Sequence, residues 1–248
     1  VLPSVPRILR RMRKTARDIE RKQPDVIVTI DSPGFVFGVI RRLKSRNCPR
    51  VHYVAPTIWA WRAGRVKKFR KHFDHLLALF PFEPPLFEAA GLDCSFVGHP
   101  IAEGAVASGN GPAFRQRHGI GTDEQVLCLL PGSRRGEVSR LGPVISEVLG
   151  LLARSNPGAR IVVPAAPNVR DAVGTLAVTW GDKVLVVNGA SERYDAFAAS
   201  DLALAASGTV TLELAYAGVP TVVIYQVGKL TGEIARRMIR IEHVSIVN

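Results

Sequence analysis

The chain has 248 residues, 47% of them hydrophobic, which suits one large domain or two small ones with a sizeable core. Composition excludes a disordered or collagen-like chain, and three cysteines without a CxxC pair favour a reduced, cytosolic-type protein. The formal net charge is +12, but residues 1–71 hold 19 Lys and Arg against four acids, whereas the remaining residues hold 14 against 17. The basicity belongs to one segment, and it indicates an anionic partner such as nucleic acid, a phosphorylated ligand or an acidic membrane surface.

Along the chain, short apolar runs alternate with amphipathic stretches, which predicts β/α alternation and parallel sheets. The first half is predicted to contain, in order, Pro6–Lys22 (helix), Val26–Ile30 (strand), Phe37–Arg46 (helix), Val51–Val54 (strand), Arg62–His72 (helix), Leu76–Phe80 (strand), Pro84–Ala90 (helix) and Phe96–Val97 (strand). The second half is predicted to contain five strands, at Val126–Leu130, Ile161–Val163, Val184–Val187, Leu202–Ala205 and Thr221–Tyr225. Four helices are predicted between them, at Glu137–Arg154, Val169–Val178, Arg193–Ala199 and Thr209–Ala217.

The two series are separated by Gly98–Asp123, which is rich in Gly, Ala, Ser and Asn and poor in apolar periodicity. We therefore expect an α/β fold with two Rossmann-like lobes, residues 1–98 and 124–248, joined by a linker at residues 99–123. Both termini look abrupt, so both lobes are expected to be truncated pieces of a longer protein. The fragment alone is expected to be unstable or inactive.

The strongest local motif is Pro131–Val138, where a predicted strand ends, a Gly-Ser turn follows and a predicted helix begins. The backbone N–H groups of Gly132 and Ser133 and the Arg134 guanidinium suit a phosphate at this point, and Glu137 lies in the first helical turn. The alternative is an ordinary strand–helix turn with solvated arginines.

A second turn of the same kind follows the strand Leu202–Ala205 and contains Ser207, Gly208 and Thr209. Glu213 lies one helical turn after Thr209, so both project from one face, and a carboxylate beside a phosphate-binding turn suits a ribose diol. The alternative is that Ser207 or Thr209 is an N-cap. Two such turns in one lobe favour a nucleoside diphosphate more than either does alone.

In the first lobe, Asp31 ends a predicted strand and suits a general base, although a turn-forming Asp before Pro and Gly is the stronger interpretation from sequence alone. Trp59 and Trp61 follow the next strand, where they suit either core packing or a wall for an amphipathic ligand. His99 lies at the predicted lobe junction, and a lone His is more often structural than catalytic. No metal-binding motif, Walker A motif or GxGxxG occurs in the sequence, so we expect neither a metal nor another cofactor.

Taken in order, these segments resemble the lipid-A-disaccharide synthases, bacterial glycosyltransferases with the two-lobed GT-B fold. The run Tyr53–Arg62 is the most specific segment, and the SGT…E turn is shared by many GT-B enzymes. The resemblance covers nearly the whole chain, and its segments are Asp31–Phe35, His52–Arg62, Phe80–Glu83, Phe96–Pro100, Pro131–Val138, Ser207–Glu213 and His243–Ser245.

The resemblance implies transfer of 2,3-diacylglucosamine from its UDP-linked donor to the 6-hydroxyl of 2,3-diacylglucosamine 1-phosphate, with inversion and release of UDP. It makes Asp31 the candidate base and Arg134 the arginine that neutralises the diphosphate, both as catalytic residues. Substrate binding is expected of the remaining candidates, which are Gly132, Ser133, Glu137, Ser207, Gly208, Thr209, Glu213, His99, Trp59 and Trp61. The chain departs from the family at Gly34 and Val36, where polar residues are common, which affects the expected polar surroundings of Asp31.

Two other functions stay open at this point. Another UDP-sugar enzyme of the GT-B type, such as a UDP-GlcNAc 2-epimerase, needs the same UDP-binding turns but not a basic, apolar acceptor lobe. A non-catalytic basic module that binds nucleic acid is the least favoured, because no nucleic-acid motif occurs and aromatic residues are few in the basic stretches.

The predicted helix Pro6–Lys22 places apolar side chains beside arginines and lysines, which suits a helix lying at an anionic membrane. Packing of the same helix on the sheet, with a solvated basic face, is equally compatible with its sequence. The expected partners are thus the donor, the phosphorylated acceptor and an anionic membrane, not nucleic acid, with a homodimer left open. The expected location is cytoplasmic, peripheral on the inner face of the inner membrane.

Overall fold

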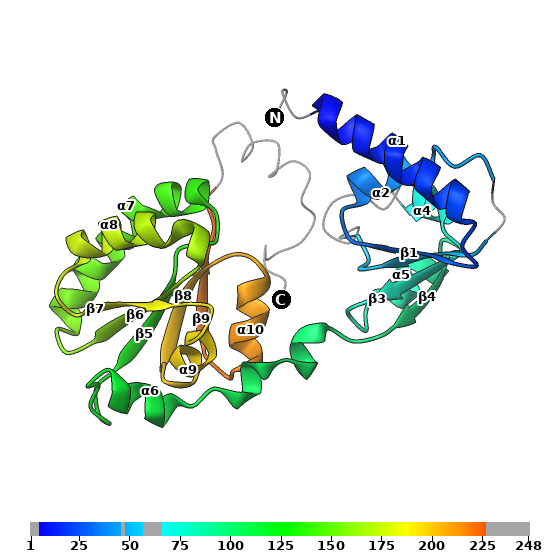
Figure 1. Cartoon of the computed structure of the whole chain (residues 1–248). Coiled ribbons are helices and arrows are strands. Elements are labelled where there is room, and N and C mark those ends of the chain that lie inside the picture. Colours follow the sequence, from blue (N-terminus) through cyan, green and yellow to red (C-terminus); the bar gives the residue numbers. More distant parts are fainter. Residues whose placement is uncertain (1–4, 46–47, 57–65, 227–248) are drawn as a thin grey trace. The chain divides into compact units, whose positions relative to one another are not determined.

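The computed structural model describes residues 5–45, 48–56 and 66–226, apart from the Lys68 side chain, and divides the chain into two compact units between His99 and Pro100 (Figure 1). Each unit contains its own parallel β-sheet with helices packed on it. The predicted α/β fold with two parallel-sheet lobes is therefore confirmed.

The first unit contains a four-stranded sheet in the order β1-β2-β3-β4, in which every neighbouring pair is parallel. Consecutive strands are thus neighbours in space, each joined to the next by a crossover connection, as parallel pairing requires. Its elements are α1 (Val5–Lys22), β1 (Ile27–Ile30), α2 (Pro33–Ile40), β2 (Arg50–Tyr53), α4 (Val66–His72), β3 (His75–Ala78), α5 (Pro84–Glu88) and β4 (Asp93–Phe96).

The core of this unit lies between the sheet and helices α2, α4 and α5. Phe69, Phe73, Leu76 and Phe87 are each at most 1% exposed and form one cluster. Helix α1 packs mainly on α2, through a second cluster formed by Met12, Ala16 and Val39. Gly38 of α2 allows this contact, because a Cβ at that position would lie 2.3 Å from the Met12 sulfur.

The second unit contains a five-stranded parallel sheet in the order β7-β6-β5-β8-β9. From the central strand β5 the chain first runs outward through β6 and β7, then returns to the other side for β8 and β9. The two directions separate between β5 and β8, and ligands of doubly wound sheets bind at the carboxyl ends of strands at such a point. Its elements are η3 (Pro100–Glu103), η4 (Ala105–Ser108), α6 (Gly111–Arg117), β5 (Val126–Leu130), α7 (Arg135–Ser155), β6 (Arg160–Ala165), η5 (Pro167–Val169), α8 (Arg170–Trp180), β7 (Val184–Asn188), α9 (Arg193–Ala198), β8 (Leu202–Ala206), α10 (Thr209–Tyr216) and β9 (Thr221–Ile224).

Residues 100–123, where the composition predicts a linker, contain η3, η4 and α6, and group with the second unit. Helix α6 packs against α9. The approach is close at two glycines: a Cβ on Gly109 would lie 2.1 Å from the Tyr194 carbonyl oxygen, and one on Gly111 would lie 2.3 Å from that of Ala198. The small residues of this segment resemble the composition of a linker, but in the structure they allow its backbone to pack closely against α9.

Most elements of the first unit differ slightly from their predicted bounds, and two of them begin three or four residues before their predicted starts. Strand β4 spans Asp93–Phe96, not Phe96–Val97, because at the edge of the sheet only Cys94 is buried and the other three positions are polar or exposed. Helix α2 begins at Pro33, directly after β1, instead of at Phe37. Proline suits the first helical position, and this preference overrides the turn predicted for Ser32-Pro33-Gly34.

No helix in the described part of the chain is both long and apolar enough to cross a membrane. The apolar sequence between Leu202 and Ile224 forms three separate short elements, β8, α10 and β9.

Candidate functional site

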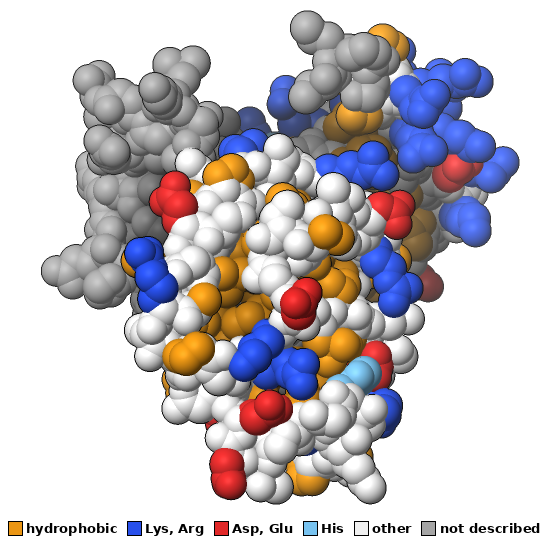
Figure 2. Space-filling view, turned by 90° about the vertical axis from the view of Figure 1, so that its left-hand side faces the viewer, with side chains coloured by type: hydrophobic (Ala, Val, Ile, Leu, Met, Phe, Trp, Pro, Cys, Tyr) orange, Lys and Arg blue, Asp and Glu red, His pale blue; other side chains and the backbone are white. Residues whose placement is uncertain are grey.

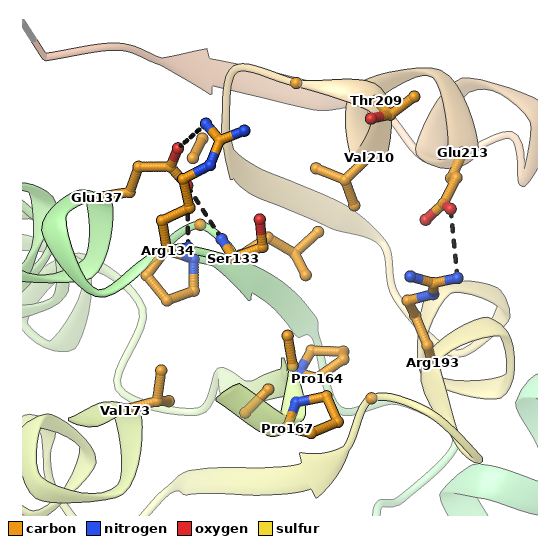
Figure 3. Close-up of a pocket in the computed structure, with 18 of the residues that line it drawn as sticks. Ser133, Arg134, Glu137, Pro164, Pro167, Val173, Arg193, Thr209, Val210 and Glu213 are labelled. Carbon is orange, nitrogen blue, oxygen red and sulfur yellow. Dashed lines mark hydrogen bonds and ion pairs between the residues drawn. The ribbon is translucent and has the colours of Figure 1, made fainter. Parts of the chain in front are cut away.

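A pocket of about 460 Å³ opens in the second unit at the carboxyl ends of β5, β6, β7 and β8 (Figure 3). Its walls are formed by the segments that directly follow these strands, including the first turns of α7, α9 and α10. The pocket therefore lies at the point where the strand order reverses, and its volume is that of a small-molecule site.

On one side of the pocket, the turn after β5 is closed by its own carboxylate. Oε2 of Glu137 accepts hydrogen bonds from the backbone N–H groups of Ser133 (3.1 Å) and Arg134 (3.2 Å). Oε1 accepts one from Nη1 of Arg134 at 2.8 Å. Gly132 permits this arrangement, because its φ is +110° and a Cβ would lie 2.7 Å from Oε2 of Glu137. The turn predicted to bind phosphate thus binds an anionic group, but here the group is internal.

Arg134 itself remains accessible at the pocket wall. Its side chain is 82% exposed, and its ion pair with Glu137 joins residues three apart in sequence. An exposed pair of this kind contributes at most about 1 kcal/mol, so a ligand with two phosphates can displace it.

The turn after β8 brings the start of α10 to the same pocket. The backbone N–H of Ser207 donates to the Ile224 carbonyl at 3.1 Å, which ties the turn to β9. Gly208 occupies the N-cap position, where it has no capping side chain, and its carbonyl accepts from the buried Thr211 hydroxyl at 2.7 Å. The structure thus places neither Ser207 nor Thr209 at the N-cap, and Thr209 is the first residue of α10.

Glu213 lies on the opposite side of the pocket from Arg134 and points toward Arg193 of α9 (Figure 3). Oε1 of Glu213 is 3.3 Å from Nη2 of Arg193. Burial raises the pKa of Glu213, and the positive charge of Arg193 opposes that shift.

Arg193 was not among the site residues predicted from the sequence, although its position carries a usable signal. The residue follows β7 after a short loop, so it belongs to the same sheet edge as Arg134 and Glu213. The turn that begins with Asn188-Gly189-Ala190 contains no arginine, so the signal in Arg193 is only its position as the first residue of the next helix.

The pocket therefore combines an exposed guanidinium, two helix starts and a largely buried carboxylate paired with a second guanidinium. Helix starts and arginine bind phosphate, and a carboxylate accepts hydrogen bonds from a ribose diol. Chemically, the set suits a ribonucleoside diphosphate.

In the first unit, Asp31 is an exposed residue at the carboxyl end of β1. Its φ is 48° and that of Ser32 is 47°, while Val54 at the end of the neighbouring strand has φ 77°. The left-handed region is unfavourable for these residues, most of all for the β-branched valine. Three strained residues at adjacent strand ends mark this edge as a functional candidate, since such strain persists mostly where function requires it.

The other first-unit candidates are placed as follows. His99 ends the unit beside the Phe80 ring, with centroids 5.8 Å apart, and burial lowers its pKa. Trp59 and Trp61 lie outside the described residues. Glu83, which sequence analysis quoted only within a motif, is 2% exposed and accepts the backbone N–H groups of Leu79 and Phe80 at the end of β3.

No group of three or more His, Cys, Asp and Glu suited to a metal ion occurs within the described ranges. The three cysteines are all free, and two of them are buried.

Residues 1–248 match the family described as lipid-A-disaccharide synthetase. The lipid-A-disaccharide synthase of Rhodospirillum centenum is 48% identical over 250 residues, covering 100% of this chain and 62% of the relative. That of Paramagnetospirillum magneticum is 48% identical over 252 residues, covering 100% and 64%. The chain thus spans less than two thirds of the length of these relatives.

Among solved structures, an S. aureus MnaA–UDP co-structure is similar with a TM-score of 0.64 and 14% identity, covering 92% of this chain and 66% of that one. UDP-GlcNAc 2-epimerase from Neisseria meningitidis, bound to UDP-GlcNAc, gives 0.61 and 15%, covering 90% and 66%. Structural similarity at a sequence identity of 14–15% shows a shared fold. The family match extends over every residue, and on that ground the chain belongs to the lipid-A-disaccharide synthetase family.

Proposed function

We propose that the protein is an inverting glycosyltransferase that moves 2,3-diacylglucosamine from its UDP-linked donor to 2,3-diacylglucosamine 1-phosphate. The observation that carries the proposal is the pocket at the strand-order reversal of the second unit, in a chain that belongs to this family. The products are lipid A disaccharide 1-phosphate and UDP.

In this proposal the pocket binds the UDP part of the donor. Arg134 and the turn residues Gly132 and Ser133 receive one side of the diphosphate, and Ser207, Gly208 and Thr209 receive the other. When UDP leaves, it carries the electron pair of the broken glycosidic bond, and the guanidinium together with the N–H groups of helix starts stabilises the added charge. Glu213 holds the ribose.

Glu137 has a defined place in this scheme. Its carboxylate occupies the N–H groups of Ser133 and Arg134, so the diphosphate takes over these donors when it binds. The residue then contributes by keeping the turn closed before the donor arrives, and its proposed role in substrate binding is indirect.

Asp31 is the proposed base. It removes the proton from the acceptor 6-hydroxyl as that oxygen attacks the anomeric carbon of the donor, and a base of this kind contributes a factor of about 10²–10⁴ in rate. The strained backbone at Asp31 and Ser32, at the carboxyl end of β1, supports this assignment. His99, Trp59 and Trp61 are proposed to contact the lipid-bearing substrates.

An anionic membrane surface is the proposed site of action, on the cytoplasmic side of the inner membrane. Helix α1 uses its apolar face against α2, while its eight Lys and Arg side chains are exposed. In Figure 2, basic side chains gather over the first unit, whereas basic and acidic side chains are interspersed over the second. Attachment to the membrane is therefore proposed to be electrostatic. Whether the protein also forms a homodimer stays open.

The test uses the complete parent protein, at the length of the curated relatives, with both lipid substrates and mass spectrometry of the products. Wild-type protein should form the disaccharide, and Asp31→Ala and Arg134→Ala should each reduce its rate by at least about 10²-fold with the fold intact. Asp25→Ala, at the opposite end of β1, and Arg154→Ala, at the far end of α7, are the matched controls.

Near-normal activity in both Asp31→Ala and Arg134→Ala would show that the site is wrongly assigned. Conversion of UDP-GlcNAc to its 2-epimer, without disaccharide formation, would replace the proposal with the epimerase hypothesis.

A further inference from the structure

The ion pair between Glu213 and Arg193 is incomplete. Oε1 of Glu213 faces Nη2 of Arg193 at 3.3 Å, while Oε2 of Glu213 and Nε of Arg193 are both buried and have no hydrogen-bond partner among the described residues. Native proteins pair nearly all such buried atoms, and the exceptions call for an explanation. Both residues line the pocket, so a ligand that forms hydrogen bonds in the pocket would explain the two unpaired atoms.

Oε2 of Glu213 needs a donor, which limits what the ligand can offer there. A phosphate at neutral pH presents only acceptors to this oxygen and is repelled by it, whereas a hydroxyl donates. The Glu213 side chain is 13% exposed, and a carboxylate in such a place forms strong, charge-assisted hydrogen bonds. This side of the pocket therefore suits the sugar hydroxyls of a nucleotide.

Arg193 is well held for a positioning role. Its helix, α9, is tied to α6 by Glu192, whose Oε1 lies 2.9 Å from Nη1 of Arg117 and 3.1 Å from Nε2 of His118. The Arg193 guanidinium also lies 4.8 Å from the centre of the Tyr194 ring, and Nη2 donates to the Tyr194 hydroxyl at 2.9 Å. These contacts fix the guanidinium on the side facing Glu213.

We propose that Arg193 is a positioning residue: it holds Oε1 of Glu213 so that Oε2 accepts the ribose 2′-hydroxyl, and it thereby sets a preference for ribonucleotides over 2′-deoxyribonucleotides. The inference rests on the proposed function, since it takes UDP as the nucleotide in the pocket. Arg193 is assigned no contact with the phosphates, whose proposed site is by Arg134, across the pocket from Glu213 (Figure 3).

The experiment measures dissociation constants of UDP, 2′-deoxy-UDP and pyrophosphate by titration calorimetry with the protein. Wild-type protein should prefer UDP to 2′-deoxy-UDP by about tenfold, the equivalent of one lost hydrogen bond to a charged group. Arg193→Met should reduce this preference to near unity and leave pyrophosphate affinity within about twofold of wild type. Arg193→Lys should restore part of the preference, because it returns the charge without the planar fork.

Arg154→Met, on the exposed end of α7, is the matched control and should keep the wild-type preference. Glu213→Gln is the second variant: it removes the charge that Arg193 pairs with and should also lose the preference, whether or not Arg193→Met folds.

Three results would overturn the inference. One is an unchanged preference in folded Arg193→Met or in Glu213→Gln, and another is a parallel loss of pyrophosphate binding, which would make Arg193 a phosphate ligand. Equal wild-type affinity for UDP and 2′-deoxy-UDP would remove the ribose contact itself. Failure of wild-type protein to bind UDP at all would instead refute the proposed function, together with the inference that depends on it.

Discussion

Among the described residues of the first unit, His52 is the least exposed ionisable side chain. It is 0% exposed, its Nδ1 shares a hydrogen bond of 2.7 Å with the Thr29 hydroxyl, and its ring lies 5.2 Å from that of Phe69 and 5.0 Å from that of Phe73. Burial lowers the pKa of His52 to about 4, and the Asp31 charge opposes the shift only partly. The residue therefore folds as a neutral imidazole.

We predict that this histidine makes the first unit acid-sensitive. Between the unfolded pKa of 6.5 and the folded pKa of about 4, the unfolded chain binds a proton that the folded unit does not. Stability is thus full above pH 6.5 and falls on acidification, by about 2 kcal/mol between pH 7 and pH 5. Native-state hydrogen exchange of β1 and β2 amides at these pH values measures it.

His52→Phe should remove this part of the pH dependence, because the Thr29 hydroxyl can still donate to the Val51 carbonyl at 3.2 Å. His75→Phe, at a partly exposed position of β3, is the control and should retain it. The same slope in wild type and His52→Phe would contradict the assignment.

A second residue-scale prediction concerns Glu137. Glu137→Gln removes the negative charge from the turn but keeps a side-chain acceptor for the backbone N–H groups. We expect a loss of about 1 kcal/mol in stability, as for a weakened helix N-terminus. We also expect tighter pyrophosphate binding, because Arg134 is released from its ion pair. Weaker binding in this variant would instead mean that Glu137 contacts the ligand directly.

The placement of Arg134 and Ser207 at one pocket could be predicted because each lies in a turn after a buried strand, and the carboxyl ends of parallel strands share one edge. Glu213 could be predicted because it lies one helical turn after Thr209, at the start of α10. The hydrogen bonds from the Ser133 and Arg134 N–H groups to the Glu137 carboxylate could not be predicted, because the same sequence also suits a turn whose N–H groups are free to bind phosphate. Arg193 pairs with Glu213 across 20 residues and two helices. That contact depends on how α9 and α10 are placed in the folded unit, which no local pattern specifies.

At the scale of elements, α6 is fixed to the second unit by the guanidinium of Arg115. Nε and Nη2 donate to the Ala199 carbonyl at 3.1 and 2.8 Å, and Nη1 donates to the carbonyls of Gly121 and Glu124 at 2.9 and 2.8 Å. Nη2 also pairs with Asp201 at 3.2 Å. One side chain thereby joins α6, the loop before β5 and the loop before β8.

Arg115→Lys is predicted to destabilise the second unit by about 2–3 kcal/mol, because an ammonium cannot supply a planar fork and leaves carbonyl groups unpaired. Native-state hydrogen exchange of β5 and β8 amides measures the change. Arg117→Lys, on the same helix but half exposed, is the matched control and should lose no more than about 1 kcal/mol. Equal effects of the two substitutions would mean that Arg115 is not the anchor.

The elements whose bounds could be predicted most closely are those in which most residues are buried and therefore apolar. Every residue of β5 is buried, and its apolar run gives both bounds correctly. Strand β4 has one buried position in four, so its polar sequence hides it. Helix α6 was hidden for a different reason, because the glycines that allow it to approach α9 also resemble a linker.

At the scale of the whole molecule, the positive charge is unequally distributed, and α1 is its largest exposed concentration in the described chain. The helix has eight Lys and Arg, all exposed, against two acids, of which Asp18 pairs with Arg21 at 3.1 Å. Because Leu9, Met12 and Ala16 pack toward α2, the large apolar side chains that α1 exposes are those of Val5 and Ile8, near its first turn. Its affinity for membranes should therefore depend on salt and on anionic lipid.

We predict that vesicles containing anionic lipid bind the protein at low salt and release it as salt rises, whereas zwitterionic vesicles do not bind. The triple variant Arg10→Gln, Lys14→Gln and Arg17→Gln should weaken binding by about 100-fold, at about 1 kcal/mol for each charge. The matched control removes three exposed charges from the second unit, at Arg154, Arg170 and Lys183, and should bind nearly as well as wild type. Vesicle co-sedimentation measures both. Equal losses in the two triple variants would assign binding to net charge alone, and tighter binding to DNA than to vesicles of equal charge would favour the nucleic-acid hypothesis.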